Sequence, residues 1–556
     1  MKNLALRASA LALLAAPCPQ ALAQAPAAAA PAPVRELTAA QWQADLDFMA
    51  AEMERRHKNL YHKVSRERFR AAVAELRGRI PKLSRNRIVV GMMRIAAMVG
   101  DGHTNVSPLK DTAFGFRSLP LKLYLFDDGL YVRAAAPDHA DLVGARIEAI
   151  GGVAVAEAIR RVGEISPRDN DFTPKLYAPI FLAMPDILEA LELGRSAGEA
   201  VLTLSKGKRR WTATVPAGPV EPSWPPDTDI SLAVREGWVD ARSTPAPPLW
   251  LQAPLTYHRL IELPEHKALY VQLNMVANVN GQTLGQFGEK IRLRAEAINP
   301  RAIVLDLRLN RGGNGYLRSG LVRELIKAED SDTRLFVLTG RGTFSASQFI
   351  LEDLDRLTDA VFVGEPAASK PNSYGDSYKS ALPNSGLLVR SSIYYWQAGQ
   401  SDRAWTPVQI AAPLTFAAYA AGRDPALEAA LSWAPGPSLA EQLVAAAKAG
   451  GTRRMMETLV AYDRAGTHRY ADTELLLGEA GQSLGWAKLY DEAAALLEEG
   501  VRRYPESANL TTVLAFVNDW AGRGETAREW GRRTLALDPN NRIVRPILER
   551  PKPPAR

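Results

Sequence analysis

Short apolar runs alternate with amphipathic segments through the centre of the chain. The apolar runs cover residues 268–273, 302–307, 335–338 and 360–363. Between them, apolar residues recur every three or four positions over residues 284–297 and 317–327, which is the period of a helix with one buried face. Continuous apolar strands that alternate with helices are typical of a largely parallel sheet covered on both faces. The pattern predicts an α/β fold with its core over residues 256–432.

The segments that precede this core have other periods. Helical spacing of apolar residues predicts an N-terminal helical domain over residues 38–108. Residues 109–216 predict a β-rich module whose first two strands are joined by an Asp-Asp-Gly turn. Residues 217–255 are rich in Pro and Trp and show no clear period, so we interpret them as a crossover segment.

The C-terminal residues 440–548 predict helices only, and their pattern repeats. Matching positions lie 34 residues apart: Ala493 and Ala527, and the pairs Tyr504-Pro505 and Asp538-Pro539. A helix–turn–helix unit of this period that ends in Pro is the tetratricopeptide pattern. We therefore expect two tetratricopeptide-like repeats, over 474–507 and 508–541, with a plain helical bundle as the alternative.

The first residues carry the three parts of a secretory signal. These parts are the basic residues Lys2 and Arg7, the short apolar run 8–16, and the small-residue site Ala21-Leu22-Ala23. We expect a signal peptide over residues 1–24, an Ala/Pro linker over 25–37, and an exported protein, periplasmic or secreted. No later stretch reaches about 18 uninterrupted apolar residues, so no integral membrane segment is expected after signal cleavage.

Composition excludes several kinds of site. The only cysteine, Cys18, lies within the signal, so the mature chain is expected to have no disulfide and no cysteine-based metal site. The formal net charge of +7 is small for 556 residues, and no basic helix accompanies it, so nucleic-acid binding is not expected. The histidines show no metal-binding spacing. We expect no metal and no cofactor.

One hydroxyl residue occupies a position suited to chemistry. Ser345 lies between the apolar run 335–338 and the next helical pattern, where free N–H groups and the helix dipole favour negative charge. The simplest interpretation is an N-cap serine. A nucleophilic serine also needs a base and an oxyanion hole. The Gly-rich turn 307–315, which follows a predicted parallel strand, offers free N–H groups at the same edge of the sheet.

Three motifs give this region a family resemblance. They are Leu305-Asp306-Leu307-Arg308-x-Asn310-x-Gly312-Gly313, Thr343-x-Ser345-Ala346-Ser347 and Val363-Gly364-Glu365-Pro366. In order and spacing they resemble the C-terminal processing (tail-specific) protease family, which includes tricorn protease and the interphotoreceptor retinoid-binding proteins. The resemblance implies a ClpP/crotonase-like α/β core and a nucleophile at Ser345. It places the oxyanion hole at the N–H groups of Gly313 and Ala346.

The resemblance leaves the base open. One branch of the family uses a lysine, whose position falls on Lys370, and the tricorn-like branch uses a histidine in an Asp-Gly-His-Thr motif, which falls on His103. In that branch a later acidic residue orients the histidine, and Asp402 is the candidate. His103 is favoured because an imidazole needs little tuning to act as a base near neutral pH, whereas a lysine must be desolvated. Gln348 departs from the family, which usually has Glu there.

The remaining modules also resemble known ones. Gly144-x-x-Ile147-x-x-Ile150-Gly151-Gly152 resembles a PDZ motif, which implies a PDZ-like module that adds a peptide as an edge strand. The helical repeats imply a surface for a protein partner. Together the features predict an exported serine endopeptidase that acts on peptides or proteins through an acyl-enzyme. The alternative is a catalytically inactive peptide- or ligand-binding scaffold on the same fold.

Overall fold

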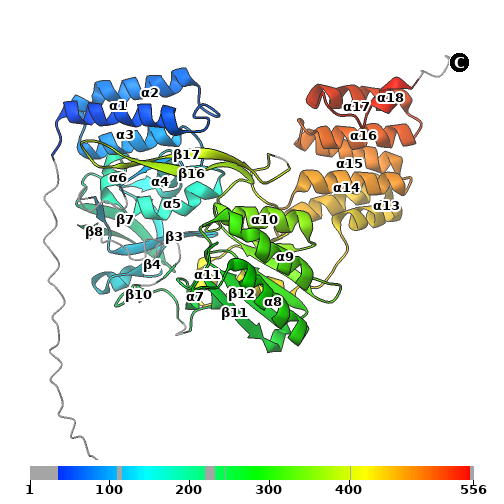
Figure 1. Ribbon diagram of the computed structural model, residues 1–556, viewed down its shortest axis with the longest axis horizontal. Helices are drawn as coiled ribbons and strands as arrows, with labels where there is room; N and C mark the ends of the chain where they lie inside the picture. The colour runs from blue at the N-terminus through cyan, green and yellow to red at the C-terminus, as the bar shows by residue number, and fades with distance from the viewer. Residues whose placement is uncertain are drawn as a thin grey trace, which may run out of the picture.

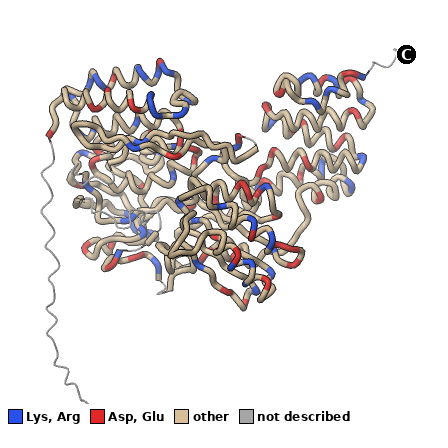
Figure 2. Tube along the Cα trace, in the orientation of Figure 1, with Lys and Arg blue, Asp and Glu red and all other residues tan. Residues whose placement is uncertain are grey.

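The computed structural model describes residues 36–108, 116–219, 232–233, 235–243, 246–400 and 402–550. The expected signal peptide, most of the linker, and the centre of the crossover segment lie outside them. The described chain is a mixed α/β fold in which an N-terminal helical layer, a β-rich module, an α/β core and a helical tail follow one another along the sequence (Figure 1). Lysine, arginine, aspartate and glutamate are interspersed over all four parts (Figure 2).

Three capped helices form the N-terminal layer. They are α1 (Ala39–Arg56), α2 (Arg66–Arg79) and α3 (Arg85–Ala97). Each begins after a Ser or Thr whose hydroxyl accepts a hydrogen bond from the first turn, which satisfies one of the free N–H groups of the helix. On α1, Trp42, Leu46, Met49 and Met53 are buried, so the predicted apolar face is the face that packs.

The β-rich module is an antiparallel sheet with helices packed against it. Its main strand order is β10–β4–β5–β7–β8, with β3 paired to β4 and β6 to β5. The strands are β3 (Leu121–Phe126), β4 (Gly129–Ala135), β5 (Arg146–Ile150), β6 (Val153–Ala154), β7 (Glu199–Lys206), β8 (Arg209–Pro216) and β10 (Val239–Asp240). The helices are α4 (Val155–Gly163), α5 (Phe172–Leu182) and α6 (Pro185–Ala190). A small separate pair joins β2 (Arg117–Ser118) to β9 (Gly218–Pro219).

A six-stranded sheet forms the α/β core. Its order is β11–β12–β13–β14–β15–β18, and only β11 is antiparallel to its neighbour. The strands are β11 (His258–Leu263), β12 (Ala268–Leu273), β13 (Ala302–Asp306), β14 (Arg334–Thr339), β15 (Val361–Gly364) and β18 (Ile410–Ala411). The four predicted apolar runs are thus β12 to β15, which are four of the five parallel strands of the sheet.

Both faces of this sheet are covered, which is why its strands are apolar throughout. Residues such as Ile303 and Leu305 pack under α8 (Leu284–Ile298), α9 (Arg318–Ala328) and α10 (Ala346–Leu357). Their neighbours Ala302 and Val304 pack on the opposite face against α12 (Pro425–Ser432). The short helices α7 (Leu249–Gln252) and α11 (Phe416–Ala420) lie beside the core. The two-sided sheet predicted from the sequence is confirmed.

A long β-hairpin connects the core to the N-terminal helices. Its strands, β16 (Asn372–Ala381) and β17 (Leu388–Gln397), pair with each other, and β17 also pairs with β1 (Asn105–Ser107). The carboxylate of Asp45 on α1 accepts hydrogen bonds from the backbone of Asn384 and Ser385 in the hairpin turn. The sequence did not predict this hairpin, because its polar strands are stabilised by docking onto other elements (Figure 1).

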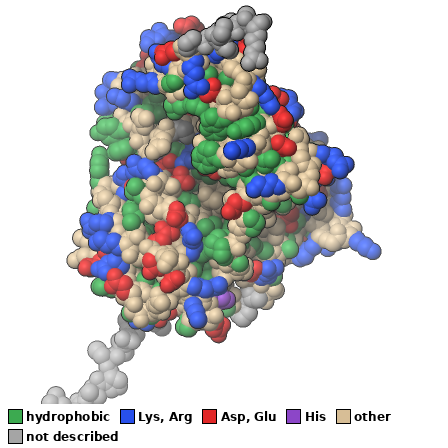
Figure 3. Space-filling model, turned by 90° about the vertical axis from the view of Figure 1, so that its right-hand side faces the viewer, with side chains coloured by type: hydrophobic (Ala, Val, Ile, Leu, Met, Phe, Trp, Pro, Cys, Tyr) green, Lys and Arg blue, Asp and Glu red, His purple; other side chains and the backbone are tan. Residues whose placement is uncertain are grey.

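The described C-terminal tail is built from helices. Its helices are α13 (Leu439–Arg464), α14 (Thr473–Trp486), α15 (Tyr490–Arg503), α16 (Ala508–Trp520), α17 (Gly524–Leu537) and α18 (Arg545–Glu549). Neighbouring helices pack side by side, and hydrophobic side chains show between charged ones on the face of the molecule that the tail forms (Figure 3). In the described part of the chain, no helix has both the length and the apolar character needed to cross a membrane.

A buried ion-pair cluster closes the core beside the Gly-rich turn. Arg308 pairs with Asp306 at the end of β13 and with Asp424 at the start of α12, and Tyr270 donates a 2.8 Å hydrogen bond to Asp306. All four side chains are largely buried. A buried carboxylate that loses its partner is strongly destabilising.

We therefore expect Arg308→Met to destabilise the α/β core by about 3–5 kcal/mol, because it leaves two buried carboxylates without a cation. The exposed Arg323 on α9 provides the control, and Arg323→Met should change stability by less than about 0.5 kcal/mol. Denaturant unfolding of the full chain, followed by intrinsic fluorescence, measures both. Equal stabilities of the two variants would contradict this role of Arg308.

Candidate active site

Ser345 lies in a strained turn between β14 and α10. It is the N-cap residue of α10, but its backbone has φ 59° and ψ −124°, a region that residues with a Cβ rarely adopt. Its hydroxyl makes no capping hydrogen bond to the helix. Within residues 341–350, Ser345 is also the only residue that is not buried. Ser345 therefore occupies the N-cap position, as the simplest interpretation predicted, but its hydroxyl does not cap the helix. This hydroxyl is free to react.

Neighbouring hydroxyl groups hold this turn in place. Thr343 donates to the carbonyl of Leu307 over 2.8 Å, and Ser347 accepts from the Phe344 N–H over 3.0 Å. The N–H of Ser345 itself donates to Ser369 Oγ over 3.0 Å. Strain of this kind persists only where the surrounding structure fixes it, and these contacts do so.

His103 reaches Ser345 from the loop between α3 and β1. Its Nε2 lies 3.1 Å from Ser345 Oγ, within hydrogen-bond reach. Its ring packs on Phe344, with 4.5 Å between the ring centroids. The sequence places these two residues 242 positions apart, and the fold brings them together.

A buried carboxylate positions the His103 loop. Asp101 Oδ1 accepts hydrogen bonds from the N–H groups of His103 and Thr104, over 2.9 and 2.7 Å, and from the Ser392 hydroxyl on β17, over 2.8 Å. Its Oδ2 lies 2.8 Å from His57 Nε2 at the end of α1. Burial acts to raise the pKa of Asp101, but its partners, His57 foremost, lower that pKa to about 2. Asp101 is therefore ionised and joins three elements behind the base.

The surroundings of His103 favour its neutral form. Burial lowers its pKa, the carboxylates of Asp101 and Asp376 act in the opposite direction, and the charge of Arg311 lowers it further. Among the described residues, His103 Nδ1 has no hydrogen-bond partner, although the nearby backbone of Tyr374 also acts to raise the pKa. A neutral imidazole whose Nε2 meets a serine hydroxyl can accept its proton.

Two backbone N–H groups beside Ser345 are unused. Gly313 has φ 135°, and neither its N–H nor that of Ala346, at the first turn of α10, donates to another described residue. Gly312 packs directly on the nucleophile, because a Cβ there would lie 2.7 Å from Ser345 Cβ. A side chain at position 312 would therefore displace Ser345. The two free N–H groups have the character of an oxyanion hole.

Lys370 and Asp402 form a pair of their own. Lys370 Nζ lies 2.8 Å from Asp402 Oδ1, and the Asp402 side chain is 74% exposed. Lys370 follows Ser369 and so lies near the nucleophile turn, but its ammonium group is held by the carboxylate. Asp402 lies on an exposed loop, where it pairs with Lys370. No hydrogen bond joins it to His103, so it does not orient the imidazole as the sequence suggested.

Gln348 belongs to the packing behind the nucleophile. Its side chain is fully buried, and its Nε2 donates to Thr406 over 2.6 Å and to Glu352 over 3.2 Å. Burial raises the pKa of Glu352, against the effects of Thr406 and Arg403. In the described chain, Gln348 Oε1 has no partner. Gln348 therefore ties α10 to the loop around Thr406.

Sequence reasoning missed one buried acid close to the base. Asp169, in the loop before α5, accepts a 2.6 Å hydrogen bond from Gly102 N–H, and a Cβ on Gly102 would lie 2.8 Å from this carboxylate. Burial, followed by the charge of Asp101, raises the pKa of Asp169 to about 7. Position 102 thus requires a glycine because the Asp169 carboxylate packs against it. No feature of the sequence links these two positions.

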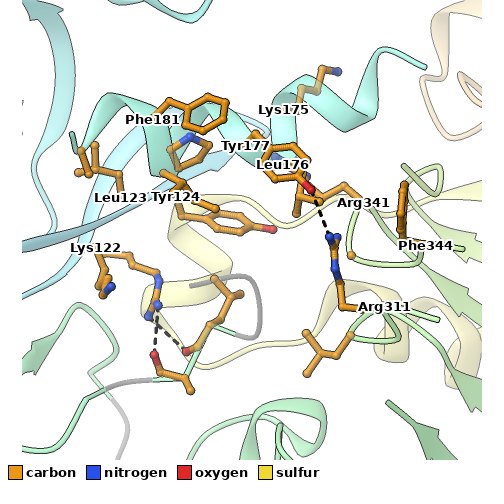
Figure 4. Close-up of a pocket in the computed structure, with 18 of the residues that line it drawn as sticks. Lys122, Leu123, Tyr124, Lys175, Leu176, Tyr177, Phe181, Arg311, Arg341 and Phe344 are labelled. Atoms are coloured by element: carbon orange, nitrogen blue, oxygen red, sulfur yellow. Dashed lines mark hydrogen bonds between the residues drawn. The ribbon is translucent and has the colours of Figure 1, made fainter. Parts of the chain in front are cut away.

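A cavity of about 1520 Å³ opens beside the two reactive side chains. Ser345 and His103 line it together with residues from β3, α5 and the Gly-rich turn. Figure 4 shows Tyr124, Tyr177 and Phe344 around this space, with Arg311 reaching up from the core. The described residues contain no group of three or more His, Cys, Asp or Glu side chains that could hold a metal ion.

Comparison with known proteins adds partial structural likeness only. No protein-family model and no curated protein matches the sequence. Mature CPAF in complex with lactacystin overlaps 69% of this chain and 96% of its own, at 13% identity and a TM-score of 0.46. The photosystem II D1 C-terminal processing protease overlaps 67% of this chain and 94% of its own, at 15% identity and a TM-score of 0.31. Tricorn protease overlaps 71% of this chain and 36% of its own, at 14% identity and a TM-score of 0.31. The function proposed below rests on the geometry of the site.

The effect of the Asp376 charge on the pKa of His103 can be tested directly. We expect a pKa below 6.5 for His103, and a still lower pKa in Asp376→Asn, because that variant removes a negative charge that raises it. Asparagine also tolerates the positive φ of residue 376. The measurement is an NMR titration of histidine labelled at Cε1, with the His103 signal assigned by its loss in His103→Gln. The remote Asp332→Asn should leave the pKa unchanged, and an upward shift in Asp376→Asn would contradict the electrostatics described.

Proposed function

We propose that this chain is an exported serine endopeptidase of the C-terminal processing type, with Ser345 as nucleophile and His103 as base. The observation that carries the proposal is the 3.1 Å approach of His103 Nε2 to Ser345 Oγ at a strained helix start with two free N–H groups. A nucleophile, a base in reach and a site for an oxyanion are the three parts that acyl transfer requires.

The reaction follows from these positions. Ser345 Oγ attacks a peptide carbonyl while its proton passes to His103 Nε2. The negative charge that develops on the carbonyl oxygen is held by the N–H groups of Gly313 and Ala346. When the C–N bond breaks, His103 returns the proton to the leaving amine, and an ester on Ser345 remains. Water, deprotonated by His103, then hydrolyses this ester and restores the serine.

His103 is proposed over Lys370 on two grounds. The imidazole meets the nucleophile directly, whereas the Lys370 ammonium is paired with Asp402 at 2.8 Å. A lysine base must be neutral, and an adjacent carboxylate stabilises its charged form. Asp101 acts as a positioning residue, because it holds the backbone of the His103 loop and does not touch the ring nitrogens. Asp402 has no part in this scheme.

The other modules suit a protein or peptide substrate. The cavity beside Ser345 is large enough for several side chains and lies between the α/β core and the β-rich module, whose motif resembles a PDZ domain. We infer that this module guides a peptide to the site, and that the helical tail binds a protein partner. On the tail, Trp486 and Leu475 are exposed, at 68% and 46%, and so are accessible to such a partner.

Labelling of the nucleophile tests the proposal. A fluorophosphonate probe should modify the purified protein, and Ser345→Ala should abolish the labelling because the attacking hydroxyl is gone. Ser432→Ala is the matched control, because this exposed hydroxyl on α12 bonds only to the backbone of its own helix. Its labelling should persist. Equal labelling of Ser345→Ala and the unaltered protein, or none of either, would assign the chain to the non-catalytic binding proteins.

The identity of the base is a separate measurement. We expect His103→Gln to slow labelling by about 10²–10⁴-fold, the usual contribution of a positioned general base. Lys370→Met should have a much smaller effect, since it breaks a partly exposed ion pair. Rates of probe incorporation over a pH series measure both. A large loss in Lys370→Met with a small one in His103→Gln would reverse the assignment.

A further inference from the structure

Arg311 places a cation beside Ser345 and His103, and no carboxylate of the described chain pairs with it. It immediately precedes Gly312, the residue in contact with Ser345, and its side chain lines the same cavity as Ser345 and His103. Its guanidinium lies over the Phe344 ring, 5.1 Å from the centroid, and His103 packs on the same ring. Burial and the nearby carboxylates have larger effects on the pKa of His103, and the charge of Arg311 lowers this pKa further. The guanidinium therefore lies close to His103.

The hydrogen-bonding capacity of Arg311 is largely unused. In the described chain, Nη1 is buried and has no partner, and Nη2 reaches only the Tyr177 hydroxyl on α5, at 3.5 Å (Figure 4). No aspartate or glutamate among the described residues pairs with it. A guanidinium has five N–H donors in a planar fork, and removing it from water without a partner costs free energy.

Two other arginines that line the same cavity are neutralised by carboxylates. Arg308 is paired with Asp306 and Asp424, and Arg341 is paired with Glu365 at 2.6 Å. Within the part of the chain that the structure describes, carboxylates thus pair with these two buried arginines and none pairs with Arg311. An anion brought by the substrate would complete the set, and the planar fork of a guanidinium matches a carboxylate in two parallel hydrogen bonds.

We propose that Arg311 forms a subsite that binds a carboxylate of the peptide substrate within about two residues of the scissile bond, an inference that rests on the proposed peptidase function. Arg311 and His103 contact the same Phe344 ring, at 5.1 and 4.5 Å from its centroid, so they lie close together. An extended peptide advances about 3.3 Å per residue, so a carboxylate one or two residues from the reacting carbonyl is within reach of Arg311. The carboxylate is either an Asp or Glu side chain or the C-terminal carboxylate of a peptide, and the two sources differ in a simple test.

The test measures binding in the Ser345→Ala background, which does not require catalysis. Three kinds of fluorescent peptide are compared, all built on one sequence with uncharged side chains. The first has an amidated C-terminus. The second is also amidated and carries one Glu, placed in turn at each position around the centre, and the third has a free C-terminal carboxylate. We expect one charged peptide to bind roughly 10- to 100-fold more tightly than the neutral one, the range typical of an enclosed charge pair. The peptide that gains identifies the source of the carboxylate.

Substitutions at residue 311 then assign the effect. Arg311→Gln should remove the preference for the carboxylate, and Arg311→Glu should reverse it toward a peptide with Lys in place of Glu, a result that a purely structural role cannot produce. Lys175→Gln, which removes another cation of the same cavity, should keep the preference. Loss of preference in Lys175→Gln equal to that in Arg311→Gln, or no preference in the starting protein, would overturn the proposal.

The two proposals fail separately. Absence of fluorophosphonate labelling on Ser345 removes the peptidase function but leaves a carboxylate preference that depends on Arg311 intact, as a property of a binding protein. Labelling on Ser345 combined with equal binding of all three peptides removes the Arg311 subsite and leaves the peptidase function intact.

Discussion

The buried carboxylate of Asp101 is the contact on which the candidate site depends. The His103 loop has no regular structure, so its position must come from outside contacts. Asp101 supplies them by accepting bonds from two loop N–H groups, from Ser392 on the hairpin and from His57 at the end of α1. Taking a carboxylate out of water is costly unless it is fully hydrogen-bonded. The contacts that satisfy this charge are therefore the same contacts that fix the base.

Ser345 illustrates the same principle on the other side of the site. A positive φ at a residue with a Cβ is unfavourable by itself. It is tolerated because Thr343, Ser347 and Ser369 bond to the turn, and because Gly312 leaves space for it. The glycine motif and the serine motif are therefore two halves of one packing arrangement.

The sequence predicted most of the core and part of the site, for identifiable reasons. Strands buried on both faces are continuous apolar runs, so β12 to β15 could be located from composition alone. The β16–β17 hairpin could not, because its stability comes from Asp45, β1 and the N-terminal helices, which are hundreds of residues away. The motifs placed Ser345 and His103 in the site, but the pairing of Asp402 with Lys370 depends on loop geometry. Likewise, only the three-dimensional arrangement shows that Arg311 has no carboxylate partner among the described residues.

The distance along the chain between the two reactive residues has a consequence for biosynthesis. His103 belongs to the segment that leaves the ribosome first, and Ser345 follows 242 residues later. Between them lie the β-rich module and most of the parallel sheet, and the hairpin that supports the base comes later still. A nascent chain thus holds His103 without Ser345, or both without the hairpin that aligns them. If the proposed function holds, activity arises only on completion of the fold, so an unfolded copy does not cut other unfolded chains.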